Sequence, residues 1–270
     1  MMWICLDAVS TSIGNPITEF GPMRFDVVTL FPDLFTPLLS NGVTRRAFEA
    51  ALVDIRFSDP RDFSAGTYRR VDDRPFGGGP GMVMMAEPLY QCLQSIQAER
   101  ADKAPVVLFS PLGKTLRHAD VVRWSASAGA TLICGRYEGL DQRFIDAHVD
   151  QQISLGDFVL SGGEIAAMAL LDAVARLQPG VLNDPQSPQF DSFNLALDGL
   201  LDCPHYTRPE VWAGQAVPDV LLSGHHAQIE RWRRDQRLLI THKLRPDLIV
   251  QARAAARLNR QDEDFLSGLA

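Results

Sequence analysis

The chain has 270 residues, enough for one large domain or two ordinary ones, and a net charge of −7. Its 46% hydrophobic and 22% charged residues are typical of a globular protein that does not enter a membrane, and its apolar runs are shorter than the roughly 18 residues of a membrane helix. The four cysteines contain no CxxC pair, so we expect reduced thiols, a cytoplasmic location and no zinc site.

The negative net charge conceals a basic region near the C-terminus. Residues 207–260 contain ten Lys or Arg against five Asp or Glu. Most of the excess lies in one helix-like segment that contains Arg231, Arg233, Arg234 and Arg237. Such a cluster in an acidic protein suggests a local contact with a polyanion, although the charge run alone favours a solvated helix face.

The first 22 residues differ in composition from the rest of the chain. They contain no Lys or Arg, and Asp7 interrupts their only apolar stretch, so they are not typical of a signal peptide. A clear strand pattern begins at Met23. We therefore expect residues 1–22 to be a disordered, dispensable extension and Met23 to be the functional start.

Strand and helix patterns then alternate as far as residue 182. Strands are predicted at 25–31, 52–57, 104–110, 130–134 and 148–155, and helices at about 34–50, 86–100, 116–127, 140–147 and 164–177. This order predicts an α/β fold with a parallel sheet covered on both faces. Residues 183–198 are rich in Pro, Asp, Ser and Asn and are interpreted as a linker, followed by a small helical domain at 199–270.

Two strand-then-glycine segments occur close together, LICGRYEGLDQR at 132–143 and ISLGDFVLSGGE at 153–164. Each begins as a short apolar run and then breaks into a turn that contains glycine. Open α/β sheets bind ligands at the carboxyl ends of their strands, where both turns fall. We expect the two turns to lie side by side and hold one small ligand.

Two other glycine-containing segments have to be distinguished from nucleotide-binding motifs. Residues 74–82, RPFGGGPGM, exclude helix and strand and expose backbone N–H groups, but they do not match G-x-G-x-x-G, and a purely structural loop remains an alternative. The sequence Gly113-Lys114-Thr115 lacks the earlier glycine of a P-loop, because Leu108 occupies that position. Hydrolysis of a nucleoside triphosphate is therefore not indicated.

Three polar residues have ordinary interpretations when spacing alone is considered. Arg176 ends an apolar helix pattern, where a cation commonly compensates the helix dipole. Asp191 lies in the linker, where a solvated carboxylate or a helix N-cap is usual. His205 lies in a proline-bounded turn, where a structural role fits as well as RNA contact.

Taken together, several segments resemble the TrmD family, the bacterial tRNA (guanine-N1)-methyltransferases of the knotted SPOUT superfamily. They occur in the family's order from Met23 to about Ile249 and are FDVVTLFPDLF, VDDRPFGGGPGM, LICGRYEGLD, SLGDFVLSGGE, LLDAVARLQPGVL, DSF, LLDCPHYTRPEVW and SGHHAQIERWRRDQ. The resemblance implies a trefoil-knotted α/β domain at 23–182, the linker at 183–198 and an all-helical tRNA-binding domain at 199–270. It also implies a homodimer.

The resemblance further implies S-adenosylmethionine as methyl donor and guanosine 37 of tRNA, next to the anticodon, as the target. It assigns Asp191 as general base for guanine N1 and Arg176 as the group that stabilises charge on O6. The implied donor-binding residues are Leu108, Phe109, Ser110, Pro111, Gly135, Tyr137, Glu138, Ser154, Leu155, Gly156, Asp157, Phe158, Val159, Leu160, Gly162 and Gly163. The implied tRNA-binding residues are Asp72, Gly78, Gly79, His205, Arg231, Arg233 and Arg234. Magnesium is implied as an assisting ion, although no carboxylate cluster for it stands out.

Two alternatives remain open at the level of sequence. A related knotted methyltransferase could act on a ribose 2′-OH or on ribosomal RNA, but a 2′-O enzyme has no need of the linker carboxylate Asp191 for guanine N1. A non-catalytic RNA-binding protein could keep the fold and the basic helix, but it would tolerate the loss of Arg176 and Asp191, and both are present.

Overall fold

The computed structural model describes residues 22–269. The predicted extension, residues 1–22, lies outside the described residues except for Pro22, so its expected disorder stays a prediction. Among the described residues, no helix is long and apolar enough to cross a membrane. Cys92, Cys134 and Cys203 are free thiols, and all three are buried.

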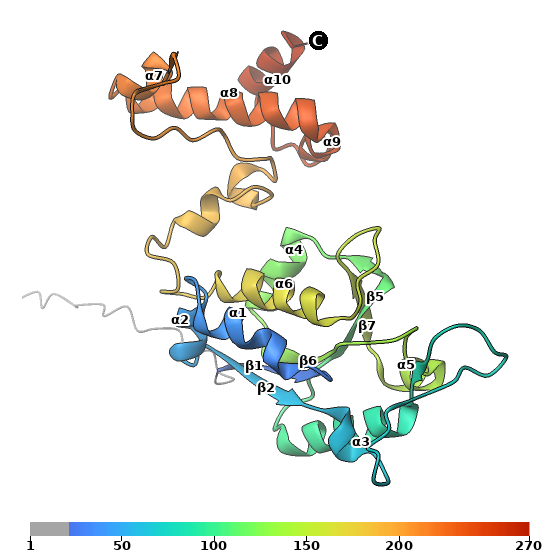
Figure 1. Ribbon diagram of the computed structural model, residues 1–270. Coiled ribbons are helices and arrows are strands. Elements are labelled where there is room, and N and C mark those ends of the chain that lie inside the picture. Colours follow the sequence, from blue (N-terminus) through green and yellow to red (C-terminus); the bar gives the residue numbers. More distant parts are fainter. Residues whose placement is uncertain (1–21, 270) are drawn as a thin grey trace, which may run out of the picture.

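A five-stranded sheet forms the centre of the N-terminal part (Figure 1). Its strands are β1 (Met23–Val28), β2 (Val53–Ser58), β5 (Val106–Thr115), β6 (Gly129–Ile133) and β7 (Gln151–Ser154). They lie in the order β2-β1-β6-β5-β7, and every neighbouring pair is parallel. The predicted parallel α/β sheet is therefore confirmed.

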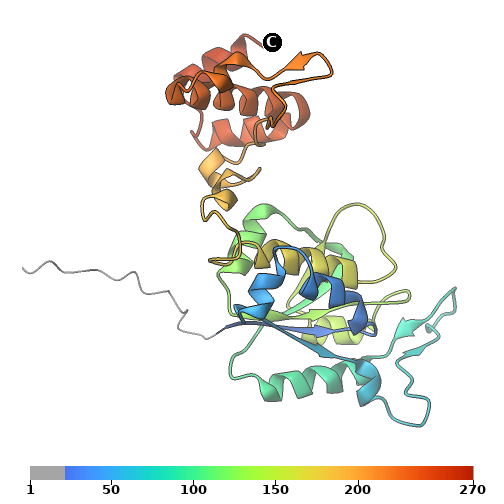
Figure 2. The ribbon, with the colours of Figure 1, turned by 60° about the vertical axis from the view of Figure 1, so that its left-hand side comes forward.

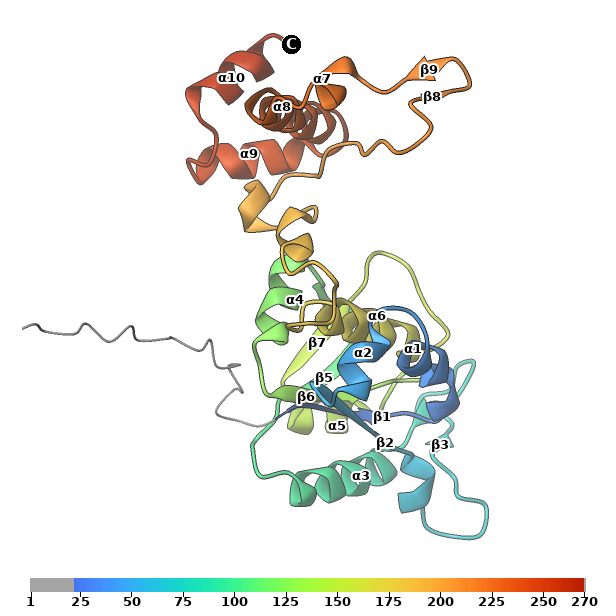
Figure 3. The ribbon, with the colours of Figure 1, turned by 90° about the vertical axis from the view of Figure 1, so that its left-hand side faces the viewer.

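Helices cover both faces of this sheet (Figures 1 and 3). One face carries α1 (Thr36–Ser40), α2 (Arg45–Glu49), α4 (His118–Ser125) and α6 (Glu164–Ala175), while the other carries α3 (Ala86–Glu99) and α5 (Gln142–His148). Successive side chains of a strand point to opposite faces, so Phe25 and Val27 of β1 enter the first core and Val28 enters the second. The strands are apolar on both faces because both faces are covered.

The segment predicted as one helix at 34–50 is instead broken into three short pieces. A 3-10 turn η1 (Pro32–Phe35) leads into α1, and α2 follows after a break at Asn41 and Gly42. Gly42 has a φ of 72°, a conformation that ends a helix and that glycine adopts without steric cost. The apolar spacing had given no sign of this break.

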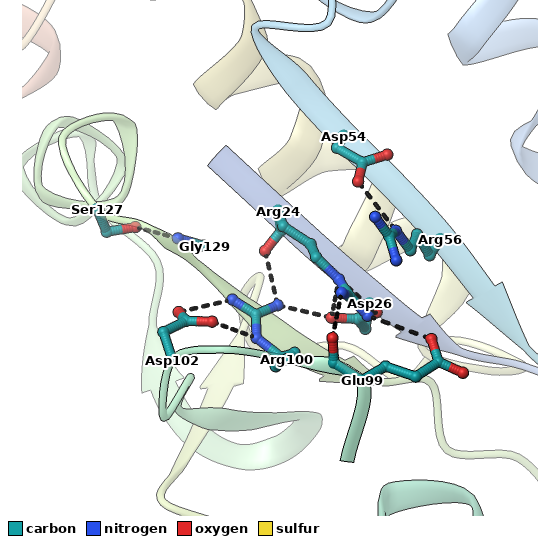
Figure 4. Close-up of polar contacts among 9 residues, drawn as sticks. All are labelled: Arg24, Asp26, Asp54, Arg56, Glu99, Arg100, Asp102, Ser127 and Gly129. Atoms are coloured by element: carbon teal, nitrogen blue, oxygen red, sulfur yellow. Dashed lines mark hydrogen bonds and ion pairs between the residues drawn. The ribbon is translucent and has the colours of Figure 1, made fainter. Parts of the chain in front are cut away.

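A buried charged cluster joins the start of β1 to the end of α3 (Figure 4). The Asp26 carboxylate, whose side chain is 2% exposed, accepts hydrogen bonds from Arg24 and from Arg100 Nη1 at 2.6 Å. Arg100 Nη1 also donates to the Arg24 carbonyl, and Gly129 of β6 approaches the same carbonyl so closely that a Cβ there would collide with it. The cluster therefore fixes β1 against its neighbour in a place where an unpaired charge would be costly.

The residues that connect β2 to α3 form an arm that projects away from the sheet (Figure 1). It contains the 3-10 turn η2 (Pro60–Phe63) and a two-stranded ribbon of β3 (Asp72–Asp73) and β4 (Val83–Met84). The four glycines of the loop between these strands all have positive φ, from 77° to 119°. The prediction that residues 74–82 form neither helix nor strand is confirmed.

After α6, the chain runs through two 3-10 turns, η3 (Ser187–Phe190) and η4 (Leu195–Leu197), into a C-terminal group of helices (Figure 2). These are α7 (Asp219–Leu222), α8 (His226–Leu244), α9 (Pro246–Ala254) and α10 (Arg260–Ser267), and they enclose a separate small core around Leu200, Leu238 and Ile249.

The C-terminal part also contains a short hairpin that the all-helical prediction did not include. Its strands are β8 (Val211–Trp212) and β9 (Gln215–Ala216). Ala213 and Gly214 between them have φ values of 50° and 78°, as in the turns that favour tight hairpins. Such turns usually carry Asn or Asp before the glycine, so Ala-Gly gave no signal in the sequence.

Candidate functional site

A pocket of about 410 Å³ lies at the carboxyl ends of β5, β6 and β7. All of the residues predicted to bind the methyl donor line it except Gly156 and Asp157. The predicted residues that line it are Leu108, Phe109, Ser110, Pro111, Gly135, Tyr137, Glu138, Ser154, Leu155, Phe158, Val159, Leu160, Gly162 and Gly163. Three segments far apart in the sequence thus form one concave surface.

An irregularity in β5 opens the space on one side of this pocket. The pairing of β5 with β7 shifts between Phe109 and Lys114, both of which are opposite Ile153. The intervening residues therefore bulge out of the ladder, and Ser110 Oγ accepts a hydrogen bond from Leu112 N at 3.1 Å within the bulge. Bulges of this kind change the direction of a strand and are common next to functional sites.

The two glycine-containing turns lie side by side, as predicted. Gly163 N donates a hydrogen bond to the Gly135 carbonyl at 2.9 Å, and a Cβ on Gly163 would lie 2.8 Å from Cys134 Cα. Tyr137 has a φ of 61°, an uncommon conformation for a residue other than glycine, and its side chain is half-exposed at the pocket. Glycine is required at Gly163 because backbone contacts backbone there.

An ion pair between Arg136 and Glu164 ties these turns together. The Glu164 side chain is 1% exposed, and its carboxylate contacts Arg136 Nε at 3.1 Å and Nη2 at 3.0 Å. Thr29 Oγ1 donates to the same carboxylate at 2.9 Å. Arg136 also donates to the Ser161 carbonyl and lies over the Phe31 ring, 4.4 Å from its centroid. The ends of β1 and β6 and the start of α6 are therefore joined at one buried carboxylate.

Sequence reasoning missed the Arg136–Glu164 pair. Both residues lie inside the glycine motifs, but 28 positions separate them, and no spacing rule relates two loops. Gly162 lies beside the pair, where a Cβ would collide with Arg136 Nε and with the Glu164 carboxylate. The two consecutive glycines before Glu164 were the one signal in the sequence that neighbouring side chains occupy the space beside Gly162.

The arm places three predicted tRNA-binding residues away from the C-terminal helices (Figure 1). Asp72 is half-buried in β3, and Gly78 and Gly79 lie in the loop with open space around them. The base of the arm contacts the pocket wall, because Glu138 N donates to the Met82 carbonyl at 2.9 Å. The arm is thus bonded to the turn that contains Glu138. His205 lies in the C-terminal part, in the turn before β8.

Arg176 and Asp191, the two predicted catalytic residues, form an ion pair. Arg176 Nη1 donates to Asp191 Oδ2, and Nη2 donates to Oδ1 at 3.2 Å, so the contact is bidentate. Each side chain is about one-third exposed. His118, at the start of α4, is a neighbour whose pKa is lowered by burial, while Asp191 raises it and Arg176 lowers it. The pair is accessible to a ligand.

Helix α6 separates this ion pair from the pocket of the same chain. Gly163, just before its first residue, lines the pocket, whereas Arg176 follows its last residue. The helix has 12 residues and is therefore about 18 Å long at about 1.5 Å per residue. Neither Arg176 nor Asp191 lines the pocket.

The basic helix α8 is less free to contact RNA than the sequence indicated. Arg231 and Arg234 both bond the buried carboxylate of Asp262 in α10, and Arg234 also contacts Asp198 at 2.8 Å. Burial alone would raise the pKa of Asp262, but hydrogen bonds from Arg234 and Asn259 hold it below its usual value. The partners of Arg231 and Arg234 are internal, so these two residues stabilise the C-terminal fold.

Arg233 and His205 remain more accessible. Arg233 is 45% exposed on its side chain and pairs with Glu230 at 2.7 Å, and His205 Nε2 lies 2.8 Å from Asp202 Oδ2. Asp202, Cys203 and His205 form the one cluster of possible metal ligands among residues 22–269. This thiol, imidazole and carboxylate set does not suit magnesium, which prefers oxygen ligands, and Asp202 is already bonded by Arg237.

The fold and these contacts define an α/β protein with a glycine-walled ligand pocket and a separate, accessible Arg–Asp pair. A family model described as tRNA (Guanine-1)-methyltransferase TrmD matches residues 23–251. The chain therefore belongs to the TrmD family and is an enzyme of the transferase class.

Curated relatives agree with this membership over nearly their whole length, and each is named tRNA (guanine-N(1)-)-methyltransferase. The chain is 75% identical over 245 residues to the protein of Albidiferax ferrireducens, covering 91% of this chain and 99% of the relative. It is 70% identical over 251 residues to that of Paracidovorax citrulli, covering 92% and 98%. It is 57% identical over 252 residues to that of Bordetella pertussis, covering 92% and 98%.

Replacing Glu164 with Gln should destabilise the protein by about 3 kcal/mol, because Arg136 would keep its charge in a partly buried place without a counter-ion. Unfolding in urea measures the change. The double variant with Arg136→Met should lose less stability than the sum of the two single variants, since the pair would be removed together. Strict additivity in this cycle would contradict the coupling.

The pairing of Asp262 should make stability depend on pH in the acid range. Its folded pKa is below the unfolded value of about 3.9, so its contribution is full above that value and is lost as pH falls through the folded pKa. Thermal melting should show Asp262→Asn to be less stable than the unmodified protein at neutral pH. The difference should shrink below about pH 4; a difference that grew on acidification would refute the pairing.

Proposed function

We propose that the protein methylates N1 of guanosine 37 in tRNA, with S-adenosylmethionine as donor, Asp191 as general base and Arg176 as the stabiliser of charge on O6. The observation that carries the proposal is the bidentate contact between Arg176 and Asp191. It places one hydrogen-bond acceptor and one cationic donor next to each other at an accessible point.

The Watson–Crick edge of guanine is complementary to this pair. Guanine presents an N1–H donor beside the O6 acceptor, so the base edge can replace the internal contact with one bond to each side chain. The N1 proton passes to the Asp191 carboxylate while Arg176 stabilises the negative charge that develops on O6. Adenine has no proton on N1 and no O6, so it cannot make the same two bonds. Access requires the nucleotide to leave its stack.

The glycine-walled pocket fits the donor. Its volume of about 410 Å³ lies within the usual range for small-molecule sites, and its walls combine apolar side chains with backbone N–H and C=O groups. The sulfonium of bound S-adenosylmethionine supplies the methyl group that guanine N1 receives. The chain's own residues hold this ligand and the guanine in line, which supplies much of the rate.

A homodimer accounts for the separation of the pocket from the ion pair. The two lie at opposite ends of α6, about 18 Å apart along its axis. A second copy of the chain, packed against the first, would bring its Asp191 to the first copy's pocket. Exposed apolar side chains at the pocket rim and at the start of α6, including Leu112, Phe158, Val159 and Ile165, support such a contact.

The trefoil knot and the domain division are also proposals. After crossing to β7 at the edge of the sheet, the chain returns over the end of β5, where Gly163 bonds Gly135 at the end of β6. This return path supports a knot formed around the pocket. A separate core around Leu200 and Leu238 supports a division at the 183–198 linker. A role for magnesium and a cytoplasmic location stay predictions.

A methyltransferase acting on a ribose 2′-OH is the second candidate. A ribose hydroxyl also loses a proton on methylation, but it has no adjacent carbonyl oxygen whose negative charge Arg176 could stabilise. The non-catalytic alternative is not favoured, because the chain belongs to a family of enzymes. The Arg176–Asp191 contact therefore favours the base over the ribose.

Asp191→Asn should lower turnover on guanosine-37 transcripts by about 10²-fold or more, because the amide cannot accept the proton, while donor binding persists. Transfer of labelled methyl groups and calorimetry of donor binding measure the two effects. Asp184→Asn, an exposed carboxylate in the same linker, is the matched control and should be fully active. Equal methylation of transcripts with adenosine at position 37 would exclude the guanine-N1 assignment.

Mixing two inactive variants tests whether the site is shared between two chains. Leu160→Trp should fill the donor pocket, and Asp191→Asn should remove the base. If each site combines a pocket from one chain with Asp191 from the other, mixed dimers contain one intact site and turnover returns. If mixed dimers form but turnover stays absent, each site belongs to one chain.

A further inference from the structure

A second cavity of about 710 Å³ lies in the C-terminal part, apart from the donor pocket and from the Arg176–Asp191 pair. One wall is the turn from Pro204 to Glu210, and the others come from α7, α8 and the residue that follows β9. The proposed chemistry at guanine N1 uses none of its residues, although His205 and Arg233 were predicted from the sequence as tRNA contacts.

Two aromatic rings and an apolar floor dominate this cavity. Tyr206 and Trp232 have ring centroids 6.2 Å apart at an interplanar angle of 58°, and the Tyr206 side chain is half-exposed. Val217, Leu221 and Ile229 provide the floor. Planar heterocycles stack on such rings without regard to their sequence, because every base has a π-face.

Two arginines and a histidine lie in the same cavity as the aromatic rings. Arg208, Arg233 and His205 line the cavity, and Glu210 is its one acidic residue. Within residues 22–269, Arg208 makes no ion pair, whereas Arg231 and Arg234 of the same region are neutralised by Asp262. Two exposed arginines, Arg208 and Arg233, thus lie in the same cavity as Tyr206 and Trp232.

We propose that this cavity, called here the Tyr206–Trp232 pocket, binds one unstacked nucleotide of the tRNA, distinct from the guanosine that is methylated. Its base stacks on Tyr206 or Trp232, and its phosphate lies against Arg208 and Arg233. The assignment rests on the proposed function for the identity of the RNA, but it adds a second point of attachment. The RNA contact proposed for this part of the chain therefore involves Arg208 and Arg233 and not Arg231 and Arg234.

Aromatic and charge variants test the pocket separately. Trp232→Ala and Tyr206→Ala should each weaken binding of an unmodified tRNA transcript about tenfold, and Trp232→Phe should restore most of it because stacking is retained. Trp212→Ala, an exposed aromatic in the neighbouring hairpin that does not line the pocket, is the matched control. Filter binding measures affinity, and thermal melting checks that each variant is folded.

Arg208→Gln should weaken binding and reduce the slope of log affinity against log salt by about one, as for the loss of one phosphate contact. Arg260→Gln, an exposed arginine of α10, is its control. In steady state, the pocket variants should raise KM for tRNA at unchanged kcat and unchanged donor affinity.

Normal tRNA affinity in folded Trp232→Ala, Tyr206→Ala and Arg208→Gln variants would overturn the inference. Equal weakening of heparin binding by the aromatic variants would also overturn it, because a polyanion without bases needs no stacking. Failure of the unmodified enzyme to methylate guanosine 37 would instead reject the proposed function. Selective loss of tRNA affinity in the aromatic variants would still support the pocket.

Discussion

The ion pair between Arg136 and Glu164 is the contact on which the ligand pocket depends. A carboxylate buried at the start of a helix is stable only when it is paired, and here the partner comes from the neighbouring turn. Because Thr29 and Ser161 join the same group, three loops that would otherwise move independently are held in one arrangement. Loops that carry function are usually mobile, but these loops are held in place by the buried ion pair.

Helix α6 has a second role besides covering the sheet. It is apolar on nearly all sides and packs along the core, so it acts as a rigid spacer between the pocket and the Arg176–Asp191 pair. A rigid spacer within one chain keeps the two halves of the proposed chemistry apart. In the proposed homodimer the same rigidity would set the register between the two chains, since both ends of the helix are positioned by the same packed core.

The parallel sheet, the positions of its five strands and the adjacent glycine turns could be predicted because apolar runs and turn residues act locally. The contacts that position the site could not. Arg136 and Glu164 are 28 residues apart, as are Arg234 and Asp262, and nothing in helix or strand periodicity relates such pairs. The basic helix shows the consequence: its arginines suggested an RNA contact, yet Arg231, Arg234 and Arg237 are bonded to carboxylates within the C-terminal part. The roles of individual residues in binding and catalysis stay predictions.

The pairing of Arg231 and Arg234 with Asp262 has a further consequence for comparing relatives. The family match ends at residue 251, and α10, which contributes Asp262, lies beyond it. A segment outside the matched residues therefore affects how much positive charge helix α8 presents to its surroundings. Two proteins with the same arginines in this helix can differ in their attraction for polyanions, depending on the tail that each one carries.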